Sequence, residues 1–152
     1  MNYILVDTAN TFFRARHVIK GALNEKIGMA LHITLNSIRK VWQEFKGDHV
    51  VFCLEGKSWR RDVYPRYKMN RKTAREALTV LEKEEEEVFW ETFTHFTNFI
   101  DTKTNCTMIQ HEQLEADDLI AGWVKAHPND NHIIISTDGD FAQLIKPNVK
   151  QY

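Results

Sequence analysis

The sequence predicts an α/β domain in which a twisted parallel sheet is flanked by helices. Short apolar runs typical of strands alternate along the 152 residues with longer runs typical of helices. This alternation favours parallel strands joined by crossover helices. Carboxylates also follow several expected strands directly, at the edge where such sheets bind their ligands. The length is that of one ordinary domain, so we expect a single domain over residues 1–152.

The first part of the chain is expected to hold two strands and two helices. A buried strand at residues 3–7 precedes a short helix at 10–19, and an amphipathic helix follows at 28–45. We infer the second helix from apolar residues at three- and four-residue spacing, namely Leu31, Leu35, Ile38, Trp42 and Phe45. A Gly-Asp turn then leads into a second strand at 49–54.

A basic loop at 55–72 opens the second part, and Pro65 excludes regular helix from its middle. Residues 73–100 carry a long helical pattern whose apolar side chains share one face, namely Leu78, Leu81, Val88, Phe89, Phe93, Phe96 and Ile100. We interpret the glutamate run at 84–87 as a solvated helix face. Expected strands at residues 105–111, 132–137 and 148–152 complete the pattern, and they alternate with expected helices at 115–126 and 141–145.

Composition narrows the class of protein. No apolar run reaches the roughly 20 residues of a membrane span, so we expect no membrane partner. Cys53 and Cys106 stand far apart in strand-like runs and are interpreted as buried free thiols of a reducing compartment. Charge is divided unevenly: residues 1–75 hold 15 Lys and Arg against 6 Asp and Glu, and residues 76–152 hold 5 against 15. A basic surface beside an acidic pocket suits a polyanionic substrate.

Six carboxylates lie just after expected strands: Asp7, Glu115, Asp117, Asp118, Asp138 and Asp140. Parallel strands bring their carboxyl ends to one edge, where these acids would repel one another unless cations lay between them. An oxygen-only ligand set favours Mg²⁺ or a similar hard cation such as Mn²⁺. Helix capping is the alternative at each cluster, because acids in a first turn accept backbone N–H groups. Three equivalent positions in one chain favour a shared metal site.

Residues 57–75 combine eight basic side chains with one acid and three aromatic rings. Cations neutralise backbone phosphates and aromatic faces stack on unpaired bases. We therefore expect a nucleic-acid surface that includes Lys57, Arg60, Arg61, Arg66, Tyr67 and Lys72. No base-reading motif is present, so recognition of backbone and shape is expected. The alternative is a solvated basic loop with a few packing aromatics.

Four motifs, in this order and spacing, resemble the 5′ nuclease (flap endonuclease) family: ILVD at 4–7, YKMNR at 67–71, EADD at 115–118 and STDGD at 136–140. That family includes the phage 5′–3′ exonucleases and the N-terminal nuclease domain of bacterial DNA polymerase I. The resemblance implies a PIN-like (resolvase-like) sheet with a basic loop-plus-helix arch at about residues 55–100. It also implies metal-dependent hydrolysis of phosphodiester bonds near the 5′ ends of flapped or duplex DNA. The compartment would be the cytoplasm of a bacterial or phage-infected cell.

The resemblance also implies roles for single residues. The six strand-end acids would bind Mg²⁺ or Mn²⁺, two cations per site in a complete enzyme. Lys68 and Arg71 would face the scissile phosphate as catalytic cations. Glu55 is a further candidate ligand, since the family has an Asp about one position away. Branched or 5′-ended DNA would be the partner, with RNA as an alternative and a separate C-terminal segment or replication protein as a further partner.

The family pattern continues beyond the position of Tyr152, into a Gly-Asp…Asp segment and a helix–hairpin–helix region that we expect to be absent from this chain. Since the family draws ligands of its second metal from that part, we expect residues 1–152 alone to hold one cation securely and to cleave slowly. Three other interpretations stay open: a PIN-type ribonuclease, a non-catalytic nucleic-acid-binding or regulatory module, and the N-terminal piece of a longer nuclease that is split or truncated after Tyr152.

Overall fold

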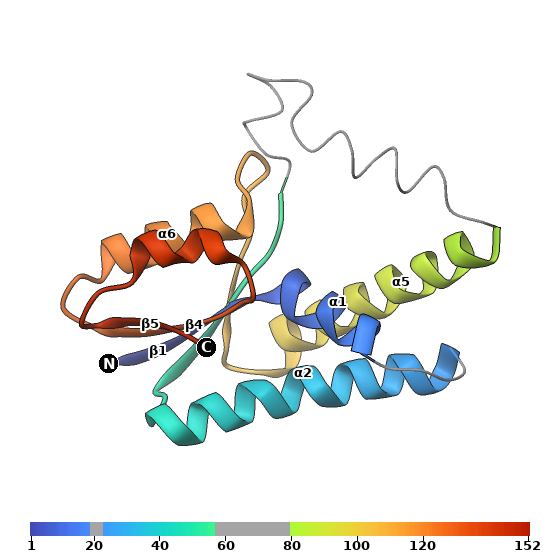
Figure 1. The fold of residues 1–152 in the computed structure, drawn as a ribbon, viewed down its shortest axis with the longest axis horizontal. Coiled ribbons are helices and arrows are strands. Elements are labelled where there is room, and N and C mark those ends of the chain that lie inside the picture. The colour runs from blue at the N-terminus through green and yellow to red at the C-terminus, as the bar shows by residue number, and fades with distance from the viewer. Residues whose placement is uncertain (19–22, 57–79) are drawn as a thin grey trace.

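A five-stranded, all-parallel sheet forms the centre of the molecule, and its strand order is β3-β2-β1-β4-β5. The computed structural model describes residues 1–18, 23–56 and 80–152 (Figure 1). Helices cover both faces of the sheet, so the predicted fold class is confirmed. The arch expected at about residues 55–100 falls partly outside the described residues and stays a prediction.

All five expected strands form: β1 (Asn2–Asp7), β2 (His49–Cys53), β3 (Thr107–Ile109), β4 (Asn131–Ile135) and β5 (Val149–Gln151). The central strand is β1, which pairs in parallel with β2 on one side and β4 on the other. The edge strand β3 is shorter than expected and begins just after Cys106, which is half-buried rather than buried as predicted. Cys53 is buried in β2 as predicted.

The helical elements are α1 (Thr8–Val18), α2 (Leu23–Phe45), α5 (Val80–Lys103), α6 (Ala116–Ala126) and the 3₁₀-helix η1 (Gly139–Leu144). The second helix begins five residues before the predicted start at Gly28. Its first turns are stabilised by tertiary packing, because Ile27 packs against a cluster that contains Phe12 and Phe89. Within the described ranges, no helix is long and apolar enough to cross a membrane.

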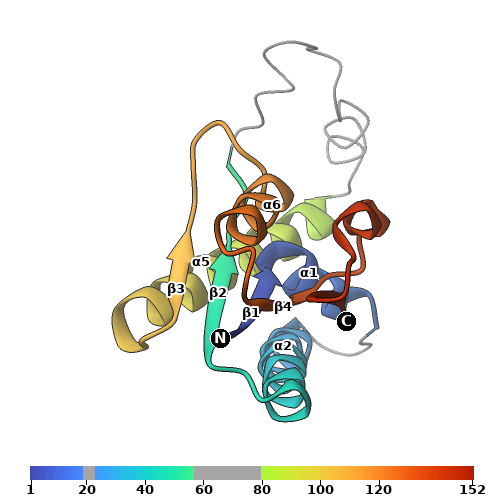
Figure 2. The same cartoon turned by 90° about the vertical axis from the view of Figure 1, so that its left-hand side faces the viewer.

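The strands bury both faces of the sheet, and alternate residues point to opposite sides. Leu5 and Ile134 pack on one side with Ile120 of α6. Val6 and Ile135 pack on the other side with helices α2 and α5. Figures 1 and 2 show α6 and α2 on opposite faces of the sheet.

The buried face of α2 differs from the predicted one. Leu35 and Trp42 are 49% and 37% exposed, whereas Ala30, Thr34 and Val41 are fully buried. A polar Thr34 is tolerated there because its hydroxyl donates to the Ala30 carbonyl oxygen at 2.8 Å. The helix is therefore rotated slightly relative to the purely apolar pattern.

The predicted apolar face of α5 is confirmed at Phe89, Phe96 and Ile100, which are buried, whereas Val88 and Phe93 are half-buried. Leu78 and the side chain of Leu81 lie outside the described part. In the glutamate run, residues 84 and 87 are exposed as expected, but those at 85 and 86 are half-buried.

Candidate metal centre

Three loops at the carboxyl edge of the sheet carry the acids that the sequence singled out. Asp7 is the last residue of β1, and the chain enters α1 directly after it. Glu115 precedes α6, on the path that follows β3, and Asp138 precedes η1, on the path that follows β4. Because the strands are all parallel, these loops share one edge, as the sequence predicts.

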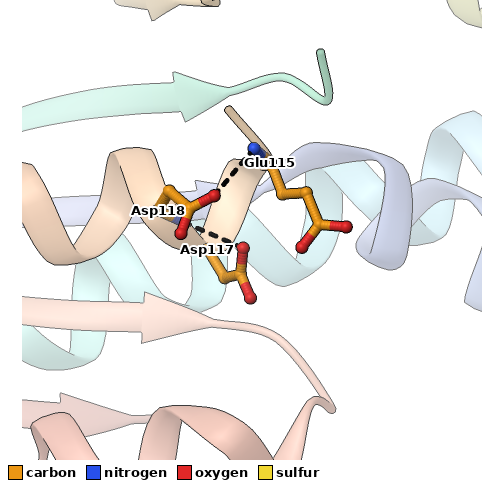
Figure 3. Close-up of side chains that lie close together, drawn as sticks. All are labelled: Glu115, Asp117 and Asp118. Atoms are coloured by element: carbon orange, nitrogen blue, oxygen red, sulfur yellow. Dashed lines mark hydrogen bonds between the residues drawn. The ribbon is translucent and has the colours of Figure 1, made fainter. Parts of the chain in front are cut away.

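Glu115, Asp117 and Asp118 form the tightest acidic group among the described residues: one oxygen of each lies within 4.8 Å of the others. Figure 3 shows their carboxylates at the start of α6. The Glu115 N–H donates to Asp118 Oδ2 at 3.0 Å, and the Asp118 N–H donates to Asp117 Oδ1 at 2.9 Å. Helix capping, the alternative interpretation, therefore does occur here. It coexists with the clustering, because the positive end of the helix dipole favours carboxylates.

Asp7 is buried, with only 5% of its surface exposed, as is Glu115 with 4%. Its Oδ2 accepts a hydrogen bond from Ser136 Oγ at 2.8 Å. Its Oδ1 is buried and has no hydrogen-bond partner among the described residues. Burial raises the pKa of Asp7 to about 6, hydrogen bonding by Ser136 and by the backbone of Asn10 lowers it, and the charges of Asp138 and Asp117 raise it. A buried carboxylate with one unpaired oxygen and like charges nearby destabilises the fold unless a proton or a cation neutralises it.

Asp138 and Asp140 contribute differently from each other. Asp138 is half-buried and caps η1, its Oδ1 accepting from the Asp140 N–H at 2.9 Å. Asp140 is exposed. Neither belongs to the tight group at the start of α6.

The electrostatic coupling shows which acids gather around Asp7. Its pKa is raised by the charges of Asp138, in the loop after β4, and of Asp117, in the first turn of α6. Acids from three strand ends thus lie in one neighbourhood, but their oxygens are not drawn into a single tight cluster.

Glu55 reaches the same neighbourhood through α6. Its Oε2 accepts from the Ala116 N–H at 3.3 Å, so this exposed side chain caps the helix beside Glu115. Its carbonyl oxygen accepts from Gln110 Nε2 at 2.8 Å, which ties the end of β2 to the loop after β3. The proximity explains why the sequence pattern pointed to Glu55, and its role as a ligand stays a prediction.

The expected cationic and stacking residues lie in 57–79, outside the described part of the chain: Lys57, Arg60, Arg61, Arg66, Tyr67, Lys68, Arg71 and Lys72. Their roles stay predictions.

Sequence reasoning missed three polar residues that support the acids. Ser136 bonds Asp7, and Asn10 Oδ1 accepts from the Thr137 N–H at 3.0 Å. Gln151 Nε2 donates to the carbonyl oxygens of Ser136 and Asp138, at 2.9 and 2.8 Å. Ser136 stands within the STDGD motif, whereas Asn10 and Gln151 are remote in sequence and carry no local signal.

The donors at this edge suit a hard divalent cation. The carboxylates supply oxygen only, and the buried, unpaired Asp7 Oδ1 is available to a ligand. Cys53 lies next to Asp7 in the sheet register, and burial raises the pKa of its thiol.

Known proteins resemble this chain in sequence and in fold. Residues 2–152 match the family described as 5′–3′ exonuclease, N-terminal resolvase-like domain. Ribonuclease H of Enterobacteria phage T4 is 35% identical over 139 residues, which cover 84% of this chain and 44% of that protein. Flap endonuclease Xni of Aeromonas salmonicida (strain A449) is 30% identical over 162 residues, covering 99% of this chain and 55% of that protein.

Solved structures of other proteins have the same fold as this chain. The T5 5′-exonuclease with divalent metal ions (zinc) bound superposes with a TM-score of 0.82 at 26% identity, covering all of this chain and 55% of that one. A T5 flap endonuclease in a pseudo-enzyme-product complex with DNA and metal ions gives a TM-score of 0.77 at 26% identity, covering all of this chain and 54% of that one. The chain thus spans about half the length of the relatives it matches. Because the family match runs along almost the whole chain and the fold agrees, this chain belongs to the 5′–3′ exonuclease family, whose N-terminal resolvase-like domain it carries.

Proposed function

We propose that this chain is the cation-binding catalytic domain of a 5′ nuclease, which hydrolyses phosphodiester bonds near the 5′ ends of flapped or duplex DNA. The observation that carries the proposal is Asp7, a buried carboxylate with an unpaired oxygen beside the charges of Asp117 and Asp138. Relatives named flap endonuclease, and a T5 relative solved with DNA and metal ions, support the choice of substrate.

The strand-end acids would hold Mg²⁺ or Mn²⁺, two cations per site in the complete enzyme. A divalent cation bound by these acids would supply Lewis-acid chemistry, namely a more acidic water and stabilisation of negative charge on the leaving oxygen. Asp7 would contribute its Oδ1, since Oδ2 is occupied by the Ser136 hydroxyl. Glu115, Asp117 and Asp118 would contribute from the start of α6, with Asp138 and Asp140 from the loop after β4.

The basic residues of the chain would bind and orient the substrate. Lys68 and Arg71 would offset the charge that develops on the scissile phosphate. The surrounding basic segment would neutralise backbone phosphates, and its aromatic rings would stack on unpaired bases. A further segment in the family's C-terminal half, or a replication protein, would share in binding the DNA. We place the protein in the cytoplasm of a bacterial or phage-infected cell, in keeping with its two free cysteines.

A cleavage assay tests the proposal. A 5′-labelled flap DNA and an RNA of the same sequence are incubated with wild type and with Asp117→Asn, in Mg²⁺, in Mn²⁺ and in EDTA. We expect cation-dependent cleavage near the 5′ end of the DNA, and its loss in the variant. The RNA arm is needed because one relative carries the name ribonuclease H.

Each other outcome favours a different interpretation. Cleavage of the RNA without the DNA would indicate a PIN-type ribonuclease. Salt-dependent DNA binding without cleavage in either metal would indicate a non-catalytic module. Equal cleavage in EDTA and in Mn²⁺ would contradict the role of the acids.

A further inference from the structure

We propose that Ser136 and Gln151 are positioning residues that hold Asp7 and Asp138 in the geometry that binds the cation. The inference rests on the proposed function, since it concerns the same site. Neither side chain belongs to the acidic set, and neither would contact the cation. Each acts through hydrogen bonds to the acids or to the loop that carries them.

Ser136 links the two acids directly. Its hydroxyl donates to Asp7 Oδ2 at 2.8 Å and accepts from the Asp138 N–H at 3.1 Å. Only 2% of its surface is exposed, so water does not compete for these bonds. Because the hydroxyl occupies Oδ2, the Asp7 carboxylate is held in the rotamer that leaves Oδ1 unpaired.

Gln151 holds the loop from the other side. Its Nε2 donates to two carbonyl oxygens, that of Ser136 at 2.9 Å and that of Asp138 at 2.8 Å. One amide group thus spans the three residues from 136 to 138. Since Gln151 belongs to β5, which pairs with β4, the sheet itself sets where this loop lies.

Electrostatics explain why such positioning is needed. Ser136 Oγ contacts both Asp7 Oδ2 and the Asp138 N–H, so the two acids lie close together and their like charges repel each other. The Asp138 loop follows the last residue of β4 and has no strand partner, and besides Ser136 and Gln151 it is held by Asn10, which accepts from the Thr137 N–H at 3.0 Å. Without its hydrogen bonds to Ser136 and Gln151, it would relax away from Asp7. The cation would then have to draw the two acids together, which weakens its binding.

Cation affinity, measured separately from stability, tests the inference. Ser136→Ala removes the hydroxyl, and Gln151→Met removes the donor while keeping the length of the side chain and adding no charge. Thr34→Val is the control for the first change, because Thr34 has a buried hydroxyl that donates within α2. Gln43→Met is the control for the second, at an exposed position of α2.

For each protein, the Kd for Mn²⁺ is measured by titration well below the melting temperature, and the melting temperature is measured in EDTA. We expect Ser136→Ala and Gln151→Met each to weaken Mn²⁺ binding by about 10- to 100-fold, as loss of groups that orient metal ligands does. Both controls should keep the wild-type Kd.

If the variants have a lower melting temperature in EDTA but the wild-type Kd for Mn²⁺, the inference is overturned, because the two residues would then contribute to stability alone. If Ser136→Ala does not fold, Gln151→Met decides by itself. Wild type that binds no Mn²⁺ would overturn the cation site itself, and the proposed function with it. The inference and the proposed function therefore fail through different results.

Discussion

Asp7→Asn should stabilise the cation-free protein at neutral pH and have little effect near pH 4. Burial and neighbouring carboxylates raise the pKa of Asp7 from 3.8 to about 6. Each pKa unit corresponds to about 1.4 kcal/mol, so ionised Asp7 should destabilise the folded state by about 3 kcal/mol. Asparagine has the same shape, and its side-chain carbonyl oxygen can still accept the Ser136 hydroxyl.

The pH window follows from the direction of the shift. The unfolded chain releases the Asp7 proton near pH 3.8 and the folded chain near pH 6. The contribution of Asp7 to the free energy of unfolding is therefore most favourable below pH 3.8, falls as the pH rises from 3.8 to about 6, and stays low above that. The asparagine variant lacks this loss, so its advantage should grow over the same interval.

Urea unfolding in EDTA measures the effect at pH 4 and pH 7.5. The free energy of unfolding of Asp7→Asn should exceed that of wild type by about 3 kcal/mol at pH 7.5, which is roughly 6–12 °C in Tm. The exposed Asp101→Asn makes the same chemical change on α5 and should alter stability by less than about 0.5 kcal/mol at either pH. An equal difference between Asp7→Asn and wild type at both pH values would refute the reasoning.

Saturating Mn²⁺ should raise the Tm of wild type, because the cation binds the folded state alone, and the gain should shrink in two variants that each remove a charge, Asp117→Asn and Asp138→Asn. In urea unfolding, Gly56→Ala should destabilise the folded state by about 1–3 kcal/mol, because the added Cβ would overlap the His111 carbonyl oxygen. Gly122→Ala in α6 should stabilise the folded state by about 0.5–1 kcal/mol, because the added Cβ would meet no atom of a neighbouring element within 4 Å. In a flap-cleavage assay Lys68→Ala should lower the rate more than the affinity, whereas Arg60→Ala combined with Arg61→Ala should chiefly weaken binding and flatten its salt dependence; the reverse pattern would move the catalytic cation away from Lys68.

The strands and the edge that carries the acids were predictable because their signals are local. Uninterrupted apolar runs such as that at 133–135 identify buried strands, and an acid just after a strand identifies the carboxyl edge. Parallel pairing then follows from the alternation of elements. No side-chain detail is needed for either step.

The parts that were missed depend on contacts between distant residues. Ser136 and Asp7 are 129 positions apart, and the amide of Gln151 reaches back 15 positions to Ser136. The buried face of α2 was misjudged because Thr34, a polar residue, satisfies its hydroxyl within the helix. The cap that Glu55 provides to α6 arises only when the ends of β2 and β3 are brought together. Periodicity contains no information on any of these.

The central claim is that acids from three strand ends share one cation site around Asp7. Anomalous diffraction from crystals grown in Mn²⁺ tests it most directly. The account predicts a peak bound by Asp7 Oδ1 at about 2.1 Å, with ligands from both the Glu115 and the Asp138 loops. No peak, or a peak confined to Glu115, Asp117 and Asp118 and remote from Asp7, would contradict it.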